Sequence, residues 1–386
     1  MQTLILRPRQ AGDQATREQV LAPAAQAIQR GQLVAFPTET VYGLGADAFN
    51  PEAIRKIYEV KGRPQDNPLI VHLSRLADLS RVARNIPALA YDLFLNFAPG
   101  PLSIVLPKHP QLPDIVTAGG DTVAVRFPAH PLARDLINFS GCPLVAPSAN
   151  ISGRPSPTTA ESCYQDLQGK IPYILDGGPS EFGVESTVLD LTSETPTILR
   201  PGGLTRERLQ DFCGRPVAYV GEEKADANSQ AVPKSPGMKY RHYAPRAKVH
   251  ILSWQDAEER KQVLANTLSQ HFAPGSLAST SGRPGLKLGF FLDQAACQDL
   301  ATLLADELPY MEIEDWHNLG KSSHLPGPLV LAFNYGQGAL QAAHALFTSF
   351  RNFDQQGCEH IYAQAEGQDD IGLAYMERLG RAASGK

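Results

Sequence analysis

Residues 36–49 read FPTETVYGLGADAF, and residues 61–73 read KGRPQDNPLIVHL. In the first stretch an apolar run ends at a proline, hydroxyl and carboxyl side chains follow, and two glycines let the backbone approach a neighbour closely. In the second stretch Lys61 and Arg63 flank a glycine just before an apolar, β-rich run. Fixed cations beside backbone amides suit a phosphate or a carboxylate. Both stretches therefore predict ligand-binding loops at the ends of buried strands.

A structural role is the alternative for each stretch. The first can be a polar turn with Tyr42 packed inside. The second can be a solvated helix end, at which the charge of Lys61 complements the helix dipole. The residues by themselves leave both alternatives open.

Two further polar stretches follow apolar runs. Residues 146–158 read APSANISGRPSPT, and residues 199–203 read LRPGG. Small hydroxyl and amide side chains suit a loop that holds a ligand, although an ordinary Ser/Pro turn has the same composition. Arg200 can reach a phosphate or remain a surface charge.

Arg126 lies inside the strand-like run TVAVRF, residues 122–127. Burying an unpaired cation is costly, so a guanidinium within an apolar strand requires a partner. A bound carboxylate is one such partner. The pattern therefore marks Arg126 as a candidate binding residue.

The composition is that of a globular protein with two or three domains. The chain has 386 residues, of which 42% are hydrophobic and 19% charged, so it can build a core and wholesale disorder is excluded. The 32 Gly and 31 Pro residues show no period, which excludes collagen and predicts many tight turns.

The charge argues against a protein held to nucleic acid by a broad basic field. The formal net charge is −5. Residues 1–220 carry 20 Lys and Arg against 21 Asp and Glu, and residues 221–386 carry 15 against 19. Neither half is basic, so non-specific binding to phosphate backbones is not expected.

The cysteines and the apolar runs bear on location. Five widely spaced cysteines without a C-x-x-C pair argue against a disulfide framework and a thiolate zinc site. The N-terminus lacks the apolar region of a signal peptide, and no apolar run reaches the ~18 residues that span a bilayer. We therefore expect no membrane contact and a cytoplasmic location.

Strand-like and helix-like segments alternate along residues 1–220, which predicts an α/β domain. The connections are irregular, so we expect a mixed, twisted sheet with helices. Asn50 and Pro51 predict the start of a helix. The expected strands are residues 33–36, 68–73, 102–106, 122–127, 144–146, 173–175, 186–191 and 197–199, and a further helix is expected at 131–139.

Residues 221–247 predict an interdomain linker, because prolines and small polar residues replace the apolar periodicity there. The pattern restarts in residues 248–386 and predicts a smaller, Rossmann-like α/β domain. Its expected strands are residues 249–252, 286–292 and 359–363. Its expected helices are residues 256–272, a long helix within 325–350, and residues 370–383.

Several standard signatures fail. Gly320-Lys321-Ser322 resembles the end of a P-loop, but the glycine that the motif requires is replaced by Asp315. Residues 43–48 fit a loose dinucleotide loop, but they neither follow a strand directly nor open a helix. The ten histidines show no metal-ligand spacing, so a zinc enzyme is not expected.

The four polar stretches together resemble the YrdC family. Lys61-x-Arg63 and Ser148-x-Asn150 match the paired K-x-R and S-x-N motifs of that family, and residues 185–203, with ESTVLDL and ILRPGG, fit as well. SPGMKYRHYAP in the linker and DDIGLAYMERLGRAA near the C-terminus are similar to the long, two-domain form. The resemblance covers nearly the whole chain, and it implies a YrdC-like catalytic domain.

The resemblance implies an ATP-dependent nucleotidyl transfer. L-threonine and bicarbonate give a carbamate, which ATP adenylylates to L-threonylcarbamoyl-AMP with release of pyrophosphate. A separate transferase complex would then move the threonylcarbamoyl group to the adenosine beside the anticodon of tRNA. The resemblance also allows weak tRNA binding, and Mg²⁺ is expected with ATP, although the sequence names no metal ligands.

The site residues are carried over from the family motifs. Lys61 and Arg63 would be the catalytic cations. The threonine site would contain Thr40, His72, Arg126, Ala146 and Ser186. The ATP site would contain Arg63, Asn67, Thr122, Ser148, Asn150, Ser156, Arg200 and Tyr243.

Three alternatives stay open. Tyr240 could close the site from the linker instead of Tyr243. A non-catalytic, RNA-binding module of YrdC type is the alternative function. Carbamoyl transfer in hydrogenase maturation is disfavoured, because the cysteine pairs of its zinc fingers are absent from this sequence.

Overall fold

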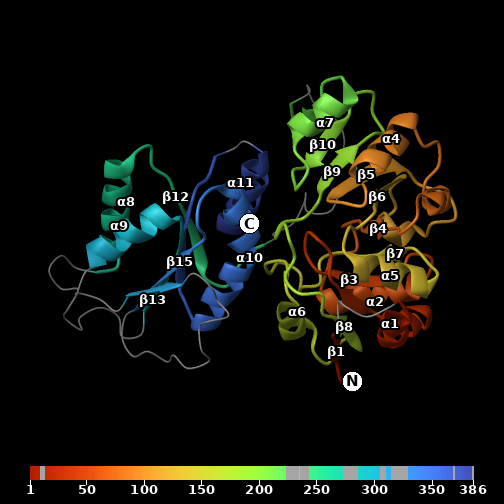
Figure 1. Cartoon of the computed structure of the whole chain (residues 1–386), viewed down its shortest axis with the longest axis horizontal. Coiled ribbons are helices and arrows are strands. Elements are labelled where there is room, and N and C mark those ends of the chain that lie inside the picture. The colour runs from red at the N-terminus through yellow and green to blue at the C-terminus, as the bar shows by residue number, and fades with distance from the viewer. Residues whose placement is uncertain are drawn as a thin grey trace. The chain divides into compact units, whose positions relative to one another are not determined.

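The computed structural model describes residues 1–8, 14–222, 234, 243–272, 286–304, 310–313, 329–367 and 370–384. They belong to two compact units, Met1–Tyr240 and Arg241–Lys386, whose elements are labelled in Figure 1. The division falls inside the stretch 221–247 that the sequence predicts as a linker.

The first unit is built on an eleven-stranded mixed sheet with the order β1-β8-β2-β3-β7-β4-β6-β5-β9-β10-β11. The central strand β4 runs parallel to β6 and antiparallel to β7, and β5 runs antiparallel to β6. The mixed sheet expected from the irregular connections is confirmed. The strands are β1 (Leu4–Leu6), β2 (Val34–Phe36), β3 (Gly43–Asp47), β4 (Ile70–His72), β5 (Leu102–Pro107), β6 (Thr122–Arg126), β7 (Leu144–Val145), β8 (Tyr173–Leu175), β9 (Thr187–Asp190), β10 (Thr197–Arg200) and β11 (Ala218–Tyr219).

The helices of this unit pack on both faces of the sheet, because alternate residues of the same strands belong to two different helix-covered cores. They are α1 (Gln14–Gln29), α2 (Pro51–Lys61), α3 (Leu79–Val82), α4 (Ala88–Phe97), α5 (Pro131–Ser140), α6 (Ala160–Leu167) and α7 (Arg206–Cys213), with short 3-10 turns at Leu76–Asp78 and Asp114–Val116. The apolar strand residues Val71, Val125 and Ile104 point into the core that α2 and α4 cover.

Helix α2 shows how local sequence places a site residue. The Asn50 side chain accepts the backbone N–H of Ala53 and caps the helix start, as predicted. Gly62 ends the helix in the left-handed conformation, with φ 62°. The last helical residue, Lys61, is therefore fixed on the buried face of the helix and is only 2% exposed.

The opposite face of the central strands carries a much smaller apolar cluster. Ile70, Val105, Ala124 and Val188 form it. The register pairs Ile70 with Ala124 and Ala124 with Val105, so these residues share one face with the residues two positions along each strand. That face therefore also carries polar side chains of β4, β5 and β6.

The second unit is a five-stranded parallel sheet with the order β12-β16-β13-β15-β14. Helices alternate with the strands, which confirms the expected Rossmann-like domain. Its strands are β12 (Lys248–Leu252), β13 (Lys287–Leu292), β14 (Tyr310–Ile313), β15 (Leu329–Asn334) and β16 (His360–Gln364). Its helices are α8 (Ala257–Ser269), α9 (Gln294–Leu304), α10 (Ala339–Gln356) and α11 (Asp370–Ala383).

The long helix expected within residues 325–350 is present as α10, but the strand that precedes it was not predicted. Residues Leu329–Asn334 form strand β15, paired on both sides, and helix α10 starts only at Ala339. A strand buried on both faces has a continuous apolar run, which periodicity alone does not separate from a helix. Gly336 and Gly338, with φ 89° and 83°, form the turn between the two elements.

The described residues bear on three other expectations from the sequence, which concern a dinucleotide loop, disulfides and a membrane-spanning helix. Residues Gly43–Asp47 form strand β3, so they are not a dinucleotide loop. The five cysteines are free thiols. No helix in the described ranges combines the length and the apolar character needed to cross a bilayer. Gly320-Lys321-Ser322 lies outside the described residues.

Candidate active site

The candidate site begins where β4 and β6 end. His72 and Arg126 are directly opposite each other in the parallel register of these strands. Ser103 on β5 is the antiparallel partner of Arg126 on its other side. Since paired residues share one face of a sheet, the three side chains lie next to one another on the face that the large core does not cover.

Arg126 is 4% exposed and forms a buried ion pair. Its Nη2 donates to Oε1 of Glu39 at 2.6 Å. The other carboxylate oxygen of Glu39 accepts the backbone N–H of Ala129 at 2.9 Å. Nε of Arg126 is buried and has no hydrogen-bond partner among the described residues. The sequence-based requirement for a partner is thus met by Glu39, and donor capacity remains for a second anion.

Glu39 and Thr40 belong to the turn after β2. The hydroxyl of Thr38 donates to the carbonyl of Val41 at 2.6 Å and lies 2.9 Å from the hydroxyl of Thr40. Both Thr40 and Glu39 are buried. This short hydrogen-bonded turn explains why the PTET segment keeps polar side chains inside the domain.

His72 is buried and neutral. Its Nδ1 donates to the carbonyl of Ile70 at 3.2 Å, so Nε2 is left as a hydrogen-bond acceptor. Burial, and then the charge of Arg126, lower the pKa of His72 from 6.5 to about 3. A neutral acceptor beside a guanidinium suits a ligand that has both a hydroxyl and a carboxylate.

Two serines and a second arginine continue this end of the site. Ser103 and Ser186 are 0% exposed, and their hydroxyl oxygens are 2.9 Å apart. Arg200 donates through Nε and Nη2 to the carbonyl of Ser186, at 3.1 and 2.9 Å. Arg200 is 7% exposed, so these bonds hold its guanidinium against the backbone of Ser186 inside the domain.

Lys61 lies at the other end of β4. Its Nζ donates to the carbonyls of Ser148 and Asn150, each at 2.6 Å. The solvated helix end considered as an alternative is therefore wrong, because the ammonium is buried against the loop after β7. The Ser148 hydroxyl donates to Oδ1 of Asn150 at 2.5 Å, which fixes the S-x-N loop on the K-x-R loop.

Arg63 and Asn67 stand beside this loop pair. Arg63 donates to the carbonyls of Asn67 and Pro68, at 3.3 and 2.8 Å. The amide nitrogen of Asn67 is buried without a hydrogen-bond partner among the described residues. Thr122, at the start of β6, lies on the same face as Arg126.

Ala146 and Ser156, two further predicted residues, make contacts close to these strands. The backbone N–H of Ala146 donates to the carbonyl of Ile70 at 3.0 Å. The hydroxyl of Ser156 donates to Oε1 of Glu185 at 2.6 Å, directly before Ser186 in the chain. The register thus places His72, Thr122 and Arg126 on one face of the sheet, and hydrogen bonds join Lys61 to the loop after β7 and Ser156 to the residue before Ser186.

The site has two ends. Thr122 and Arg126 are four residues apart on β6, so their Cα atoms are separated by about 13 Å. One end holds His72, Arg126, Ser186 and Arg200. The other end holds Lys61, Arg63, Asn67, Thr122, Ser148 and Asn150. Between the two ends lies the small apolar floor of Ile70 and Ala124.

Tyr243 belongs to the second unit. Its ring stacks on Phe347 with centroids 5.2 Å apart, and the guanidinium of Arg378 lies 5.4 Å from its centroid. Its contribution to ATP binding stays a prediction, and Tyr240 lies outside the described residues.

Lys234, within the predicted linker, donates to Oδ2 of Asp190 at 2.9 Å on the site face of β9.

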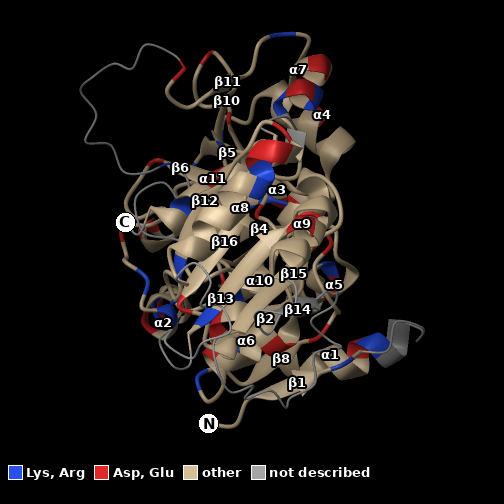
Figure 2. Cartoon of the chain, turned by 90° about the vertical axis from the view of Figure 1, so that its left-hand side faces the viewer, with Lys and Arg blue, Asp and Glu red and all other residues tan. Residues whose placement is uncertain are grey.

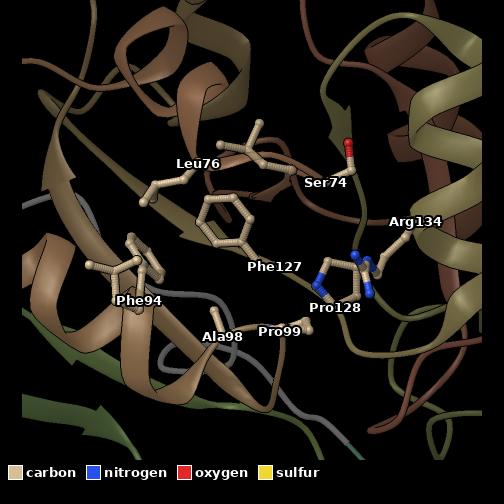
Figure 3. Close-up of a pocket in the computed structure, with 10 residues that line it drawn as sticks. Ser74, Leu76, Phe94, Ala98, Pro99, Phe127, Pro128 and Arg134 are labelled. Carbon is tan, nitrogen blue, oxygen red and sulfur yellow. The ribbon is translucent and has the colours of Figure 1, made fainter.

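Two further features delimit the site. Within the described ranges, no group of three or more His, Cys, Asp or Glu side chains is arranged to hold a metal ion. A cavity of about 170 Å³ lies beside the ends of β4 and β6, walled by Leu76, Phe94 and Phe127 with Arg134 at its rim (Figure 3). None of the predicted site residues lines that cavity.

Sequence reasoning missed three buried residues of this site. Glu39 was visible as a carboxylate after β2, but nothing in the spacing links it to Arg126. Ser103 is a single polar residue inside the run LSIVL, which is a signal of the same kind as Arg126. Glu185 became recognisable only through its contact with Ser156.

The chain matches two protein families in succession. Residues 26–202 match the Sua5–YciO–YrdC family, described as Telomere recombination. Residues 204–384 match the family described as Threonylcarbamoyl-AMP synthase, C-terminal domain.

Relatives of similar length carry one name. Threonylcarbamoyl-AMP synthase of Pyrococcus abyssi is 40% identical over 366 residues, which cover 94% of this chain and 93% of the relative. That of Bacillus subtilis is 39% identical over 372 residues, with 96% and 95% covered. The crystal structure of P. abyssi Sua5 complexed with L-threonine is 37% identical, with a TM-score of 0.77 and 99% and 98% of the two chains covered.

Proposed function

The chain belongs to the Sua5/YrdC family of threonylcarbamoyl-AMP synthases, and from that membership we propose that it converts L-threonine, bicarbonate and ATP to L-threonylcarbamoyl-AMP and pyrophosphate. Such a reaction is a nucleotidyl transfer. The relatives favour it over the non-catalytic RNA-binding module, since they are named as synthases. The described Lys and Arg residues are also interspersed with Asp and Glu in Figure 2.

One observation carries the proposal most directly. A buried arginine, Arg126, lies beside the neutral His72 at one end of a sheet face, while Lys61 and Arg63 are buried at the other end. The substrates bring a carboxylate, a carbamate and a triphosphate together. The residues that hold the amino-acid carboxylate and those that hold the nucleotide would be about 13 Å apart, the length of four strand residues, so the carbamate and the α-phosphate would meet between them.

At the threonine end, we assign the substrate carboxylate to Arg126 and the substrate hydroxyl to Nε2 of His72. Thr40, Ala146 and Ser186 would enclose the rest of the amino acid. The α-amine attacks the carbon of CO₂ in equilibrium with bicarbonate, one C=O electron pair moves to oxygen, and loss of a proton from nitrogen to solvent gives the carbamate; with bicarbonate itself, a C–O bond breaks and water leaves. Recognition by buried, preorganised donors keeps this geometry without reorganisation during the reaction.

At the nucleotide end, Asn67, Thr122, Ser148, Asn150 and Ser156 would hold ATP. A carbamate oxygen bonds to the α-phosphorus, the bond from that phosphorus to the bridging oxygen breaks, and pyrophosphate leaves. Lys61, Arg63 and Arg200 would stabilise the charge that develops on the phosphates. Tyr243 remains assigned to ATP on the family motif alone.

The remaining expectations are also proposals. We expect Mg²⁺ to enter with ATP, held by phosphate oxygens and water, since Mg²⁺ needs few protein ligands in nucleotide sites. The product would pass to a tRNA threonylcarbamoyl transferase complex in the cytoplasm. We expect direct tRNA binding to be weak and salt-sensitive.

Pyrophosphate release tests the proposal. The protein is incubated with ATP, Mg²⁺ and bicarbonate, and each of the common amino acids is added in turn. Threonine alone should stimulate pyrophosphate formation strongly. Equal stimulation by all amino acids, or none by threonine, would refute the function, and tight tRNA binding without threonine-dependent turnover would favour the RNA-binding module.

A further inference from the structure

We propose that Glu39 is a positioning residue that orients the Arg126 guanidinium toward the substrate carboxylate. The inference rests on the proposed function, because it deepens the role of Arg126 in threonine recognition. Glu39 is one of the most buried charged residues of the first unit, 4% exposed, and it lies at the threonine end of the site.

The carboxylate of Glu39 is shared between two donors. One oxygen accepts Nη2 of Arg126 at 2.6 Å, and the other accepts the backbone N–H of Ala129 at 2.9 Å. Ala129 follows β6 by three residues, so Glu39 ties the side chain at the end of that strand to the backbone just beyond it. The two bonds fix the plane of the carboxylate and, through it, one edge of the guanidinium.

The backbone that carries Glu39 is itself held in place. Its carbonyl accepts the N–H of Phe182 at 2.8 Å. On either side, the hydroxyl of Thr38 accepts the N–H groups of Thr40 and Val41, at 3.2 and 3.3 Å. These contacts hold the backbone of Glu39 in one conformation, and the side chain therefore starts from a fixed position beside Arg126.

The pair leaves part of Arg126 unused. A guanidinium has five N–H donors, and Nη2 supplies one of them to Glu39. The buried Nε has no partner among the described residues, and a buried donor without a partner is costly. A carboxylate that reaches Nε would complete the hydrogen bonding of a guanidinium whose other edge is already held.

Glutamine at this position is a sharp test, because it has nearly the same shape with a single acceptor oxygen. If that oxygen accepts from Arg126, the amide NH₂ group faces the N–H of Ala129, and two donors then face each other. If the amide is flipped, the NH₂ group faces Nη2 of Arg126 with the same result. Glu39→Gln must therefore break one of the two contacts. Asp166→Asn is the matched control, since Asp166 also accepts one arginine, Arg154, and one backbone N–H, but lies away from the threonine end.

The experiment measures threonine- and ATP-dependent pyrophosphate release in the full chain. Glu39→Gln should raise the KM for threonine at least about tenfold and leave the KM for ATP within about twofold, because misplacing a binding group is costly while the ATP end is untouched. Asp166→Asn should leave the KM for threonine within about twofold. An unchanged KM for threonine in folded Glu39→Gln protein overturns the inference, whereas a wild type without threonine-dependent release overturns the proposed function instead.

A measurement on the wild-type protein covers the case of a variant that does not fold. Arginine-selective ¹⁵N NMR, assigned through Arg126→Lys, should show resolved, slowly rotating Nη signals for Arg126 without threonine. Threonine should then shift its Nε signal. Averaged Nη signals together with an unmoved Nε would overturn the positioning role.

Discussion

His72 and Arg126 face each other across the parallel strands β4 and β6, and the buried imidazole is neutral beside the buried guanidinium. Protonating His72 would place two positive charges side by side away from water, which is unfavourable. Burial first, and then the guanidinium, keep His72 in the form that accepts a hydrogen bond, and this relationship gives the first prediction.

Acid should destabilise the first unit through His72. The pKa of His72 is lowered, first by burial and then by Arg126, to about 3 in the folded protein. Between that value and the ordinary ~6.5 the unfolded chain binds a proton that the folded chain does not, so the free energy of unfolding falls as the pH falls. At pH 5 the loss should be about 2 kcal/mol relative to pH 7.5.

His72→Gln is the comparison for this prediction. Urea unfolding of both proteins at pH 7.5 and pH 5 measures the difference in free energy. The variant should lose less stability on acidification than the wild type. Equal losses in the two proteins would show that His72 is not held neutral by the fold.

Glu39 and Arg126 should be strongly coupled in stability. Removing one partner of a buried ion pair leaves the other charge uncompensated, which costs about 3 to 5 kcal/mol. Glu39→Gln with Arg126→Gln should therefore cost less than the sum of the single variants by about 2 kcal/mol or more.

Chemical unfolding of the four proteins in this cycle gives the coupling energy. The exposed pair Glu52–Arg55 on α2 is the control, because exposed pairs of this kind contribute at most about 0.5 kcal/mol. Coupling no larger than in the control pair would contradict the buried ion pair.

Lys61→Ala together with Arg63→Ala should lower kcat/KM for ATP by at least about a hundredfold, because buried cations near the phosphates stabilise developing charge. Arg55→Ala, on the exposed face of the same helix, should leave it unchanged. Circular dichroism of the double variant must match that of the wild type, which shows that the variant folds without the loop contacts of Lys61. Near-normal turnover in the double variant would refute the assigned role.

Acid should also weaken the second unit, through its cluster of histidines. Nε2 of His250 lies 2.9 Å from Nδ1 of His360, and the ring of His271 lies 4.8 Å from that of His360. Burial and then the neighbouring His360 lower the pKa values of His250 and His271. Stability should therefore fall as the pH drops below the ordinary histidine range, and the slope should be smaller in His250→Gln. An identical slope in that variant would contradict the prediction.

Much of the fold followed from local sequence signals. The start of α2 at Asn50 and Pro51 and the strand around Arg126 were predicted correctly, because capping residues and alternation act locally. Strand β15 was not predicted, since burial on both faces removes the alternation that marks a strand. Pairing order in the mixed sheet could not be predicted, because it depends on contacts distant in the chain.

The candidate site shows the same limit. The sequence could identify Arg126 as a buried cation that needs a partner, from the apolar residues around it. Its partner Glu39 lies 87 positions away in the chain, and no spacing rule connects the two. Lys61 could not be separated from a solvated helix end, because its burial depends on the carbonyls of the loop after β7.

Formation of the mixed anhydride itself tests the account most directly. The protein is supplied with L-threonine, ATP, Mg²⁺ and isotopically labelled bicarbonate, and the adenylate product is analysed by mass spectrometry. The account predicts threonylcarbamoyl-AMP that carries one labelled carbon, at a rate strongly reduced in Arg126→Gln but not in Arg134→Gln. An adenylate without the labelled carbon, or none that requires threonine, would contradict it.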